Sequence, residues 1–277
     1  MPPVPRRATV VPRRVPAADG TSGDEGDRPG NPVALITGAS SGIGAAVAER
    51  FAADGRCRLL LGGRDEGRLA SVAGRTGGIP LAGDLATRAG VERLAERALA
   101  EAGRVDVLVA SAGLGWAGPF TGMPAEAVDR LLAVNLVGVV QLVRLVLPGM
   151  VRRGTGRVVL IGSVAGSVGV RGEAVYAATK GGLLAFADSL RYELAGTAVR
   201  VATVQPGAVD TPFFGRRGAP YHRERPRPVA ASRVADAVWR AAVRGREDQF
   251  VPGWLDLPAR VHGAVPGVFR ALAKRFG

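Results

Sequence analysis

Three polar side chains in the middle of the chain have the types and spacing to transfer a proton. Ser163 follows an apolar run that ends at Ile161, Tyr176 comes thirteen residues later, and Lys180 lies four residues beyond Tyr176. A tyrosine and a lysine at positions i and i+4 share one face of a helix. A free phenol with a pKa of ~10 is a poor base at neutral pH, and a nearby ammonium stabilises the phenolate. We therefore predict that Lys180 lowers the pKa of Tyr176.

A glycine-rich segment near the start of the globular sequence has the pattern of a phosphate-binding turn. It reads Thr37-Gly38-Ala39-Ser40-Ser41-Gly42-Ile43-Gly44, between an apolar run and a segment with helical spacing. Gly38 permits a tight turn, Gly42 lets the backbone approach a pyrophosphate, and Gly44 allows the helix to pack closely. The free N–H groups and the helix dipole then face an anion. The segment predicts a dinucleotide site, with a purely structural turn as the alternative.

The residues after the second apolar run bear on the choice of nucleotide. An acidic residue there would bind the 2′-hydroxyl of NAD, but the sequence reads Leu61-Gly62-Gly63-Arg64. Because a guanidinium can bind a 2′-phosphate through two hydrogen bonds, we predict that NADP is preferred and NAD is possible. The alternative is that Arg64 lies on a solvated loop. Asp84, followed by Leu85, is a candidate for the adenine edge or for a helix cap.

Elements that would position these groups alternate regularly along the chain. Strand–helix repetition of this kind predicts right-handed crossovers and a parallel sheet covered on both faces. The fold class is therefore α/β, a doubly wound Rossmann-type sheet in a single domain. The predicted strands are Val33–Ile36, Arg58–Leu61, Val105–Ala110, Arg157–Ile161, Val199–Val204 and Phe250–Val251, and the predicted helices are Gly42–Ala53, Val91–Ala102, Ala125–Leu147, Ala174–Leu194 and Ala230–Arg244.

Taken together, these motifs resemble the short-chain dehydrogenase/reductase family in its compact form, over about residues 32–252. Thr37–Gly44 matches the TGxxxGIG cofactor loop, Tyr176 to Lys180 matches the YxxxK motif, and Ser163 stands at the usual distance. Asn135 matches the catalytic asparagine of the family. The segment that contacts the nicotinamide matches Pro206, Gly207, Val209 and Thr211.

The resemblance implies a role for each catalytic residue. Tyr176 is the general acid/base, and Ser163 hydrogen-bonds the same substrate oxygen. Lys180 tunes Tyr176 and holds the nicotinamide ribose, and Asn135 supports a water-linked proton relay. The implied function is hydride transfer between NADP(H) and a substrate carbonyl or alcohol. A non-catalytic NADP-binding regulator or scaffold is the alternative.

One motif departs from the family pattern. NNAG after the fourth strand reads Ala110-Ser111-Ala112-Gly113. Ala112 and Gly113, which let the backbone pass close to the cofactor, remain. The missing amide side chains usually bridge the sheet, and we expect Ser111 to replace part of that bonding.

The loops beyond the strand ends should form the substrate pocket. Their side chains are mainly apolar, which favours a lipophilic ketone, aldehyde or secondary alcohol, although ordinary core closure would give the same composition. Residues 215–228 are rich in arginine, proline and glycine and resemble a mobile lid, with solvated surface as the alternative. The candidate pocket residues are Leu114, Trp116, Val164, Val170, Phe213 and Phe214.

The net charge of +13 over 277 residues first suggests a nucleic-acid or membrane partner. All but two of the 37 basic residues are arginine, which points to composition rather than function, and the excess concentrates in residues 215–277. No nucleic-acid-binding motif is present, so we predict no such partner. Cys57 is the sole cysteine and excludes an internal disulfide. We predict a cytoplasmic protein without a metal site.

The two ends differ from the central domain. Residues 1–31 lack apolar periodicity and are predicted to be a disordered tail without a signal peptide. Residues 253–277 form a basic amphipathic extension that could lie on an anionic membrane, on a second subunit or on the chain's own surface. Leu131–Met150 is interrupted by polar residues and is predicted to be a buried helix rather than a membrane span. The family resemblance implies a homodimer or homotetramer built on the Asn135 and Tyr176 helices.

Overall fold

A computed structural model of the chain describes residues 30–221 and 226–276, with side chains up to residue 271. The compact unit begins at Asn31. Positions 1–29 of the predicted disordered tail and positions 222–225 of the predicted lid lie outside the described residues, so these parts of the two predictions remain untested.

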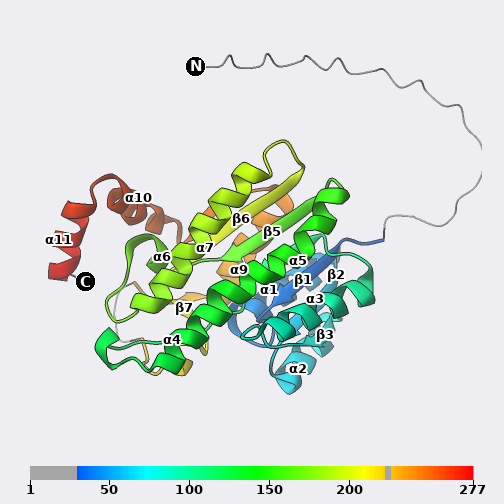
Figure 1. Cartoon of the computed structure of the whole chain (residues 1–277), viewed down its shortest axis with the longest axis horizontal. Helices are drawn as coiled ribbons and strands as arrows, with labels where there is room; N and C mark the ends of the chain where they lie inside the picture. The colour runs from blue at the N-terminus through cyan, green and yellow to red at the C-terminus, as the bar shows by residue number, and fades with distance from the viewer. Residues whose placement is uncertain (1–29, 222–225, 277) are drawn as a thin grey trace, which may run out of the picture. The chain divides into compact units, whose positions relative to one another are not determined.

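The core of the fold is a parallel sheet with the strand order β3-β2-β1-β4-β5-β6-β9 (Figure 1). Its central strands β1, β4 and β5 are mainly buried apolar residues, as expected for a sheet covered on both faces, whereas the edge strands β3 and β9 are partly exposed. A short parallel pair, β7 (Val209–Asp210) and β8 (Val229–Ala230), lies apart from it. The strands of the sheet are β1 (Val33–Thr37), β2 (Arg58–Gly63), β3 (Ile79–Ala82), β4 (Val107–Ala110), β5 (Gly156–Ile161), β6 (Val199–Pro206) and β9 (Asp248–Val251).

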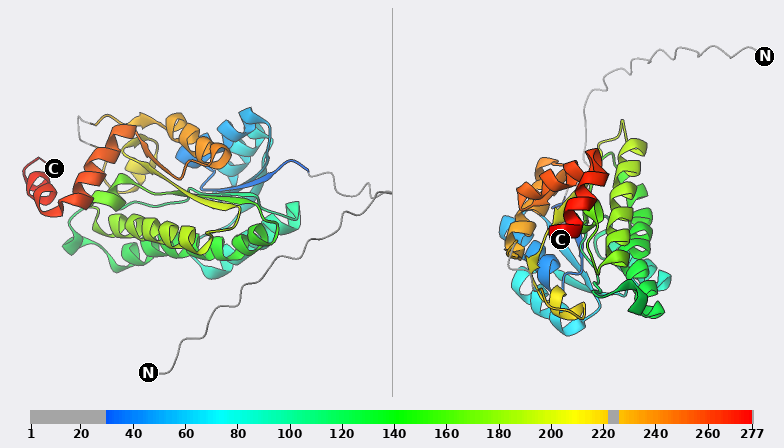
Figure 2. Two further views of the ribbon diagram at one scale, coloured as in Figure 1. Left: turned by 90° about the horizontal axis from the view of Figure 1, so that it is seen from above. Right: turned by 90° about the vertical axis from the view of Figure 1, so that its left-hand side faces the viewer.

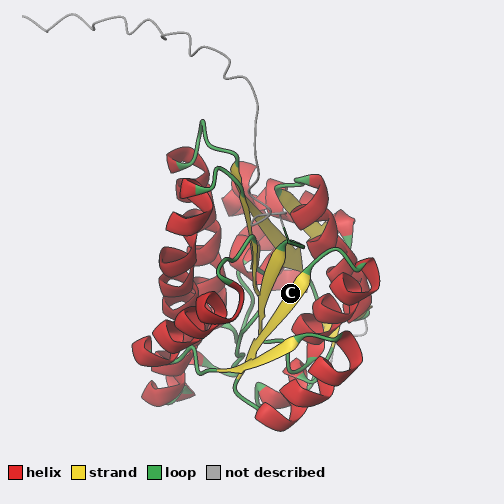
Figure 3. Cartoon of the chain, turned by 90° about the vertical axis from the view of Figure 1, so that its right-hand side faces the viewer, coloured by secondary structure: helices red, strands yellow, loops and turns green. Residues whose placement is uncertain are grey.

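Helices cover both faces of the sheet (Figures 2 and 3). One apolar core packs α3 (Arg88–Ala102), α5 (Gly138–Arg152) and α7 (Ala174–Glu193) against the sheet. The other packs α1 (Gly42–Asp54), α2 (Glu66–Thr76) and α9 (Ala231–Arg244). The predicted doubly wound fold is confirmed. The remaining helical elements are η1 (Phe120–Gly122), α4 (Ala125–Leu132), η2 (Ala133–Val137), α6 (Val164–Val168), α8 (Phe213–Arg216), η3 (Gly253–Leu255), α10 (Asp256–Ala264) and α11 (Pro266–Phe276).

The helix predicted over Ala125–Leu147 differs from the prediction in two ways. A π-helical turn, η2, separates α4 from α5 and carries Asn135. The helix also continues through Pro148 to Arg152. Pro148 removes one backbone hydrogen bond, but Met150, beyond it, is fully buried against the core and keeps the last turn in place. The combined helix, Ala125–Arg152, is the one described helix long and apolar enough to span a membrane, and 44% of its most apolar window is buried inside the fold.

The strand order places a crevice at one edge of the sheet. The chain runs outward from β1 to β2 and β3, then returns to pair β4 with the other side of β1. In doubly wound sheets, ligands bind where the strand order reverses, outside the carboxyl ends of the strands. The strands β1, β2, β4, β5 and β6 all end at this edge, so the loops that follow them begin there.

Candidate active site

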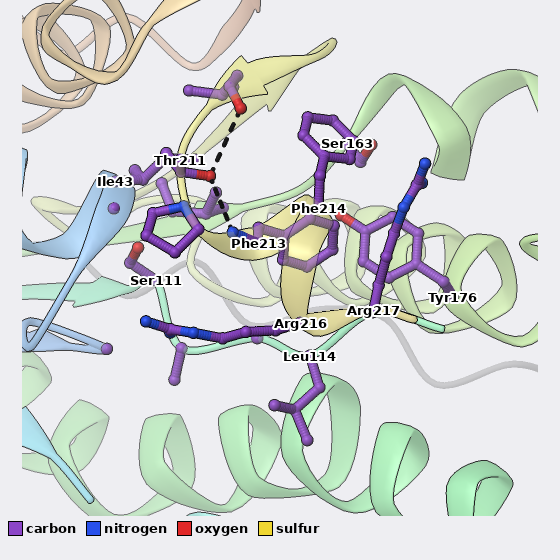
Figure 4. Close-up of a pocket in the computed structure, with 18 of the residues that line it drawn as sticks. Ile43, Ser111, Leu114, Ser163, Tyr176, Thr211, Phe213, Phe214, Arg216 and Arg217 are labelled. Atoms are coloured by element: carbon purple, nitrogen blue, oxygen red, sulfur yellow. Dashed lines mark hydrogen bonds between the residues drawn. The ribbon is translucent and has the colours of Figure 1, made fainter. Parts of the chain in front are cut away.

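A cavity of about 910 Å³ opens at this edge of the sheet (Figure 4). The structure brings all of the sequence-predicted cofactor residues to its wall, together with Ser163, Tyr176 and Lys180. These residues come from segments that lie up to 173 positions apart, from Gly38 to Thr211. Two predicted site residues, Asn135 and Trp116, are not part of the cavity lining.

The glycine turn is shaped by close backbone approaches. Gly38 has a φ of +67° and Gly42 a φ of +57°, both in the left-handed region that favours glycine. A side chain on Gly38 would also lie 2.8 Å from the Cα atom of Ala112, on the loop after β4. A side chain on Gly44 would lie 2.2 Å from the carbonyl oxygen of Gly38. The third glycine therefore lets α1 pack on the turn itself.

The turn has the free polar groups that a dinucleotide requires. The N-cap of α1, Ser41, makes no side-chain capping bond, so N–H groups at the positive end of this helix face the cavity. Beside the turn, the hydroxyl of Ser111 is buried without a hydrogen-bond partner among the described residues. A buried hydroxyl of this kind is costly unless a ligand binds it. The residues present therefore fit a nucleotide cofactor.

The hydrogen bonds that we expected Ser111 to supply in place of the missing amide side chains come from another residue. Because its hydroxyl has no partner within the described parts of the chain, Ser111 does not replace the missing amide bonding there. Thr37 does so instead: its Oγ1 accepts hydrogen bonds from the backbone N–H groups of Ser111 and Ala112, at 3.1 and 3.2 Å. It also lies 3.5 Å from the carbonyl oxygen of Val109. One buried hydroxyl thus joins the ends of β1 and β4.

Asp84 lines the cavity and does not cap the following helix. Its Oδ1 accepts a hydrogen bond of 3.0 Å from the backbone N–H of Ala86, which closes a local turn. Thr87 caps α3 by accepting from the N–H of Gly90. The capping alternative for Asp84 is wrong, and its place beside Leu85 on the cavity wall agrees with the adenine-edge hypothesis.

Tyr176 and Ser163 meet inside the cavity. Ser163 caps α6, where its Oγ accepts a hydrogen bond of 3.2 Å from the N–H of Ala165, and it lines the cavity together with Tyr176. Burial raises the pKa of Tyr176 to about 12, the Ser163 hydroxyl opposes the rise, and the Glu173 carboxylate adds to it. The predicted lowering of this pKa by Lys180 is wrong for the protein alone, because desolvation outweighs the stabilisation of the phenolate.

Lys180 lies one helical turn from Tyr176 on α7, as its spacing predicts. Its side chain is 5% exposed, and its Nζ donates a 2.7 Å hydrogen bond to the carbonyl oxygen of Ile161. The Nζ atom is 5.8 Å from the centre of the Tyr176 ring. Burial lowers the pKa of Lys180 to about 8. The ammonium is thus fixed at the end of β5, where it can also reach a cofactor hydroxyl.

Asn135 is completely buried behind the cavity. Its amide exchanges two hydrogen bonds of 2.8 Å with the backbone of Leu114 and lies 3.3 Å from the hydroxyl of Thr179. Both side-chain N–H groups therefore have partners. Asn135 fixes the loop after β4 to α7 beside Lys180, so its side chain positions the site.

The substrate end of the cavity is mainly apolar. Leu114, Val164, Val170, Phe213 and Phe214 line it as predicted. The ring of Phe213 is 5.6 Å from that of Tyr176 and 5.8 Å from that of Phe214 (Figure 4). Trp116, also predicted for this pocket, does not line the cavity in the structure, and its ring packs over Gly118.

A buried ion pair at this end was not predicted. The guanidinium of Arg217, from the predicted lid, bonds the carboxylate of Glu173, three residues before Tyr176, and lies 4.6 Å from the centre of the Phe214 ring. The exposed fractions of the two charged side chains are only 9% and 15%. Nothing in the sequence links these residues, which are 44 positions apart and belong to two different loops.

Comparison with known proteins agrees with this geometry. The model of the short chain dehydrogenase family matches residues 32–221. An uncharacterized oxidoreductase from Staphylococcus saprophyticus is 38% identical over 189 residues, 66% of this chain and 80% of its own.

Two solved structures extend the comparison. A short-chain dehydrogenase from Sphingobium yanoikuyae in complex with NADPH has a TM-score of 0.75 and 34% identity, covering 89% of this chain and 96% of its own. One from Burkholderia phymatum in complex with NAD has a TM-score of 0.77 and 26% identity, covering 85% and 94%. Sequence, sheet order and the Ser–Tyr–Lys geometry thus lead to one conclusion: the chain belongs to the short-chain dehydrogenase/reductase family of NAD(P)-dependent oxidoreductases.

Proposed function

We propose that the protein is an NADP-dependent oxidoreductase that interconverts a lipophilic ketone or aldehyde and the corresponding alcohol, with Tyr176 as general acid/base. The observation that carries the proposal is the placement of Ser163, Tyr176 and Lys180 on the wall of one cavity that continues to the glycine turn. A proton donor beside a nucleotide cradle has no use in a passive scaffold, and this disfavours the non-catalytic alternative.

The side chains of the site would divide the work as follows. Ser163 holds the substrate oxygen next to the Tyr176 hydroxyl, which donates its proton in reduction and accepts one in oxidation. Lys180 holds the cofactor ribose while its Nζ is fixed by the carbonyl oxygen of Ile161. Asn135 holds the loop at Leu114 against α7 through its hydrogen bonds to Leu114 and Thr179. The bound nicotinamide supplies or receives the hydride. Phe213 and Phe214 exclude water from the reacting oxygen.

NADP is favoured at the adenosine end of the cavity. β2 ends at Gly63, which leaves no carboxylate on that residue for a 2′-hydroxyl, and Arg64 lines the cavity directly after it. The NADPH bound by the Sphingobium relative supports this assignment, and the NAD bound by the Burkholderia structure leaves NAD as a weaker cofactor.

The substrate is inferred to be uncharged as well as apolar. Two arginines, Arg171 and Arg217, line the cavity at the substrate end, and Glu173 already neutralises Arg217, the buried one of the two. An acidic substrate would have to displace a buried carboxylate, which is costly.

The experiment that tests this function is an NADPH oxidation assay with a panel of ketones and aldehydes. Aromatic and long-chain carbonyl compounds should be reduced, with kcat/KM at least ~10-fold above that of matched keto acids. NADPH should be favoured over NADH, because one charge-assisted phosphate contact contributes about 1.5–3 kcal/mol. Binding of NADPH without reduction of any carbonyl compound would support the scaffold instead.

We also infer a homo-oligomer in the cytoplasm. Leu132 at the end of α4, Val137 in η2 and Tyr192 on α7 are exposed on the helices of Asn135 and Tyr176. Apolar side chains on this surface provide a contact for a second copy in a homodimer or homotetramer.

We infer, further, a peripheral contact of the C-terminal helices with anionic membranes. Figures 1 and 2 show α10 and α11 at the edge of the fold, and Trp254, Leu257, Val265 and Val268 there are 46–67% exposed. Residues 253–277 carry four basic side chains and one acidic one. Exposed apolar side chains with a positive net charge match an anionic lipid surface.

The membrane contact can be tested by vesicle flotation. The wild type should float with phosphatidylglycerol vesicles and not with phosphatidylcholine vesicles, and the double variant Leu257→Glu/Val268→Glu should lose ~10-fold or more in affinity. Leu99→Glu, at an exposed apolar position on α3, is the control. If the double variant floats as well as the control, the contact is excluded.

A further inference from the structure

Three guanidinium groups surround the adenosine end of the cavity, and they come from two distant parts of the chain. Arg64 and Arg68 belong to the turn and first helical residues after β2. Arg216 is the last residue of α8, on the loop that forms the substrate wall, and it also lines the cavity. The sequence analysis identified only Arg64.

Arg216 is directed to the cofactor turn. Its Nη1 donates a 3.1 Å hydrogen bond to the hydroxyl of Ser41, 175 positions earlier in the chain. Figure 4 shows the side chains of Arg216 and Arg217 pointing apart, Arg217 beside Tyr176 and Arg216 below Ser111, toward the side of Ile43. Two consecutive arginines thus serve the two ends of one cavity.

The charges at the adenosine end do not balance. Asp65 is the acidic side chain whose charge acts on Arg216, and it already caps α2 through the N–H of Arg68 and pairs with the Arg68 guanidinium at 2.8 Å. Among the described residues, neither Arg64 nor Arg216 forms an ion pair. Burial and the charges of Arg68 and Arg64 lower the pKa of Arg216, an effect that Asp65 only partly offsets. The three guanidinium groups and the Asp65 carboxylate together hold an excess of about two positive charges, the magnitude of one phosphate monoester dianion.

We propose that Arg216, together with Arg64 and Arg68, binds the 2′-phosphate of NADP, so that the substrate loop itself supplies part of the cofactor specificity. This inference rests on the proposed function, since it assigns a residue to the same cofactor site. A guanidinium that bonds the Ser41 hydroxyl is already within reach of a phosphate over the glycine turn, and a charge-assisted contact to phosphate replaces the weaker neutral one.

The position of Arg216 on α8 gives the contact a second effect. α8 packs on the loop after β4, because a side chain on Gly115 would lie 2.6 Å from the Phe213 ring, and the N–H of Ala117 donates to the carbonyl oxygen of Arg217. Phe213 lies against Tyr176. Binding of the phosphate by Arg216 therefore holds the aromatic wall of the substrate pocket over Tyr176, which couples NADP binding to a formed substrate site.

The test compares the affinities of NADPH and NADH by titration of full-length variants. Arg216→Ala should weaken NADPH binding ~10-fold or more and change NADH binding less than ~3-fold, as expected for a charge-assisted phosphate contact. Arg64→Asp should have the same pattern with a larger effect. Arg227→Ala removes an exposed charge elsewhere on the same loop and should change neither affinity.

Hydrogen exchange of the peptide 213–221 provides the second measurement. NADPH should slow exchange of this peptide more than saturating NADH does, and the difference should vanish in Arg216→Ala. Equal losses of NADPH and NADH affinity in Arg216→Ala, or no loss, would overturn the assignment. A wild type that binds the two nucleotides equally would instead contradict the proposed NADP preference.

Discussion

Replacing Tyr176 with phenylalanine should abolish turnover while leaving NADPH bound. The substitution removes one hydroxyl from a ring that packs against Phe213, and Ser163 keeps its bond from the Ala165 N–H, so the fold has no reason to change. Loss of a positioned general acid/base lowers rates about 10²–10⁴-fold. We expect kcat to fall by about three orders of magnitude, measured by NADPH oxidation, with the Kd for NADPH within ~3-fold of the wild type.

Tyr192→Phe is the matched control, because Tyr192 lies on the same helix and is 78% exposed. Its kcat should equal that of the wild type. If Tyr176→Phe kept more than a tenth of the wild-type kcat with an intact fold, Tyr176 would not be the proton donor.

The pH dependence supplies an independent check on Tyr176. The raised pKa, about 12 in the protein alone, keeps the phenol protonated below pH 10. Titration of Tyr176 should therefore not affect reduction, which uses the phenol as acid, between pH 6 and 9, whereas a decline above pH 8 would report loss of the Lys180 proton. Oxidation uses the phenolate, whose small population grows tenfold per pH unit, so its kcat/KM should rise with pH. In Tyr176→Phe this rise should disappear.

Replacing Gly44 with alanine should have the largest effect on the cofactor cradle. The added Cβ would lie 2.2 Å from the carbonyl oxygen and 2.6 Å from the carbonyl carbon of Gly38. Both are backbone atoms of a tight turn, so the turn and α1 must separate. Overpacking of this kind costs about 3 kcal/mol of unfolding free energy. Urea unfolding should show that loss, and NADPH affinity should fall ~10-fold or more because the turn is displaced.

Gly74→Ala, in α2, is the control for the effect of replacing a helical glycine by alanine where no close approach exists. No atom lies within 4 Å of a Cβ added there, and alanine favours a helix interior by up to ~1 kcal/mol over glycine. This variant should be as stable as the wild type or more stable. Equal stability of Gly44→Ala and Gly74→Ala would show that the close approach at Gly44 does not constrain the turn.

The fold and most of the site could be predicted because their signals are local in the sequence. Buried parallel strands appear as short apolar runs, and the turn from Thr37 to Gly44 carries its requirements in adjacent positions. Tyr176 and Lys180 are four positions apart, so the helical period alone predicts that they share one helix face. Strand order then brings the ends of β1, β4, β5 and β6 together without further information.

The features that were missed depend on contacts between distant segments. The Glu173–Arg217 pair and the bond from Arg216 to Ser41 cross 44 and 175 positions, and in an arginine-rich chain no single arginine stands out. The pKa of Tyr176 was predicted in the wrong direction because helix spacing reveals the Lys180 neighbour and not the depth of burial. Ser111 was assigned a bond that the hydroxyl of Thr37 makes instead.

The π-helical turn at Asn135 joins the two halves of one long helix. A π-turn contains one residue more than an α-turn, and deleting one residue between 133 and 137 would restore the regular spacing. The turn accommodates that extra residue, so α4 and α5 would keep nearly the same phase, but the residues of η2 would shift by one position relative to the flanking helices. Asn135 would then no longer face both Leu114 and Thr179. The centre of this long helix should therefore tolerate the deletion of a residue less well than the loops do.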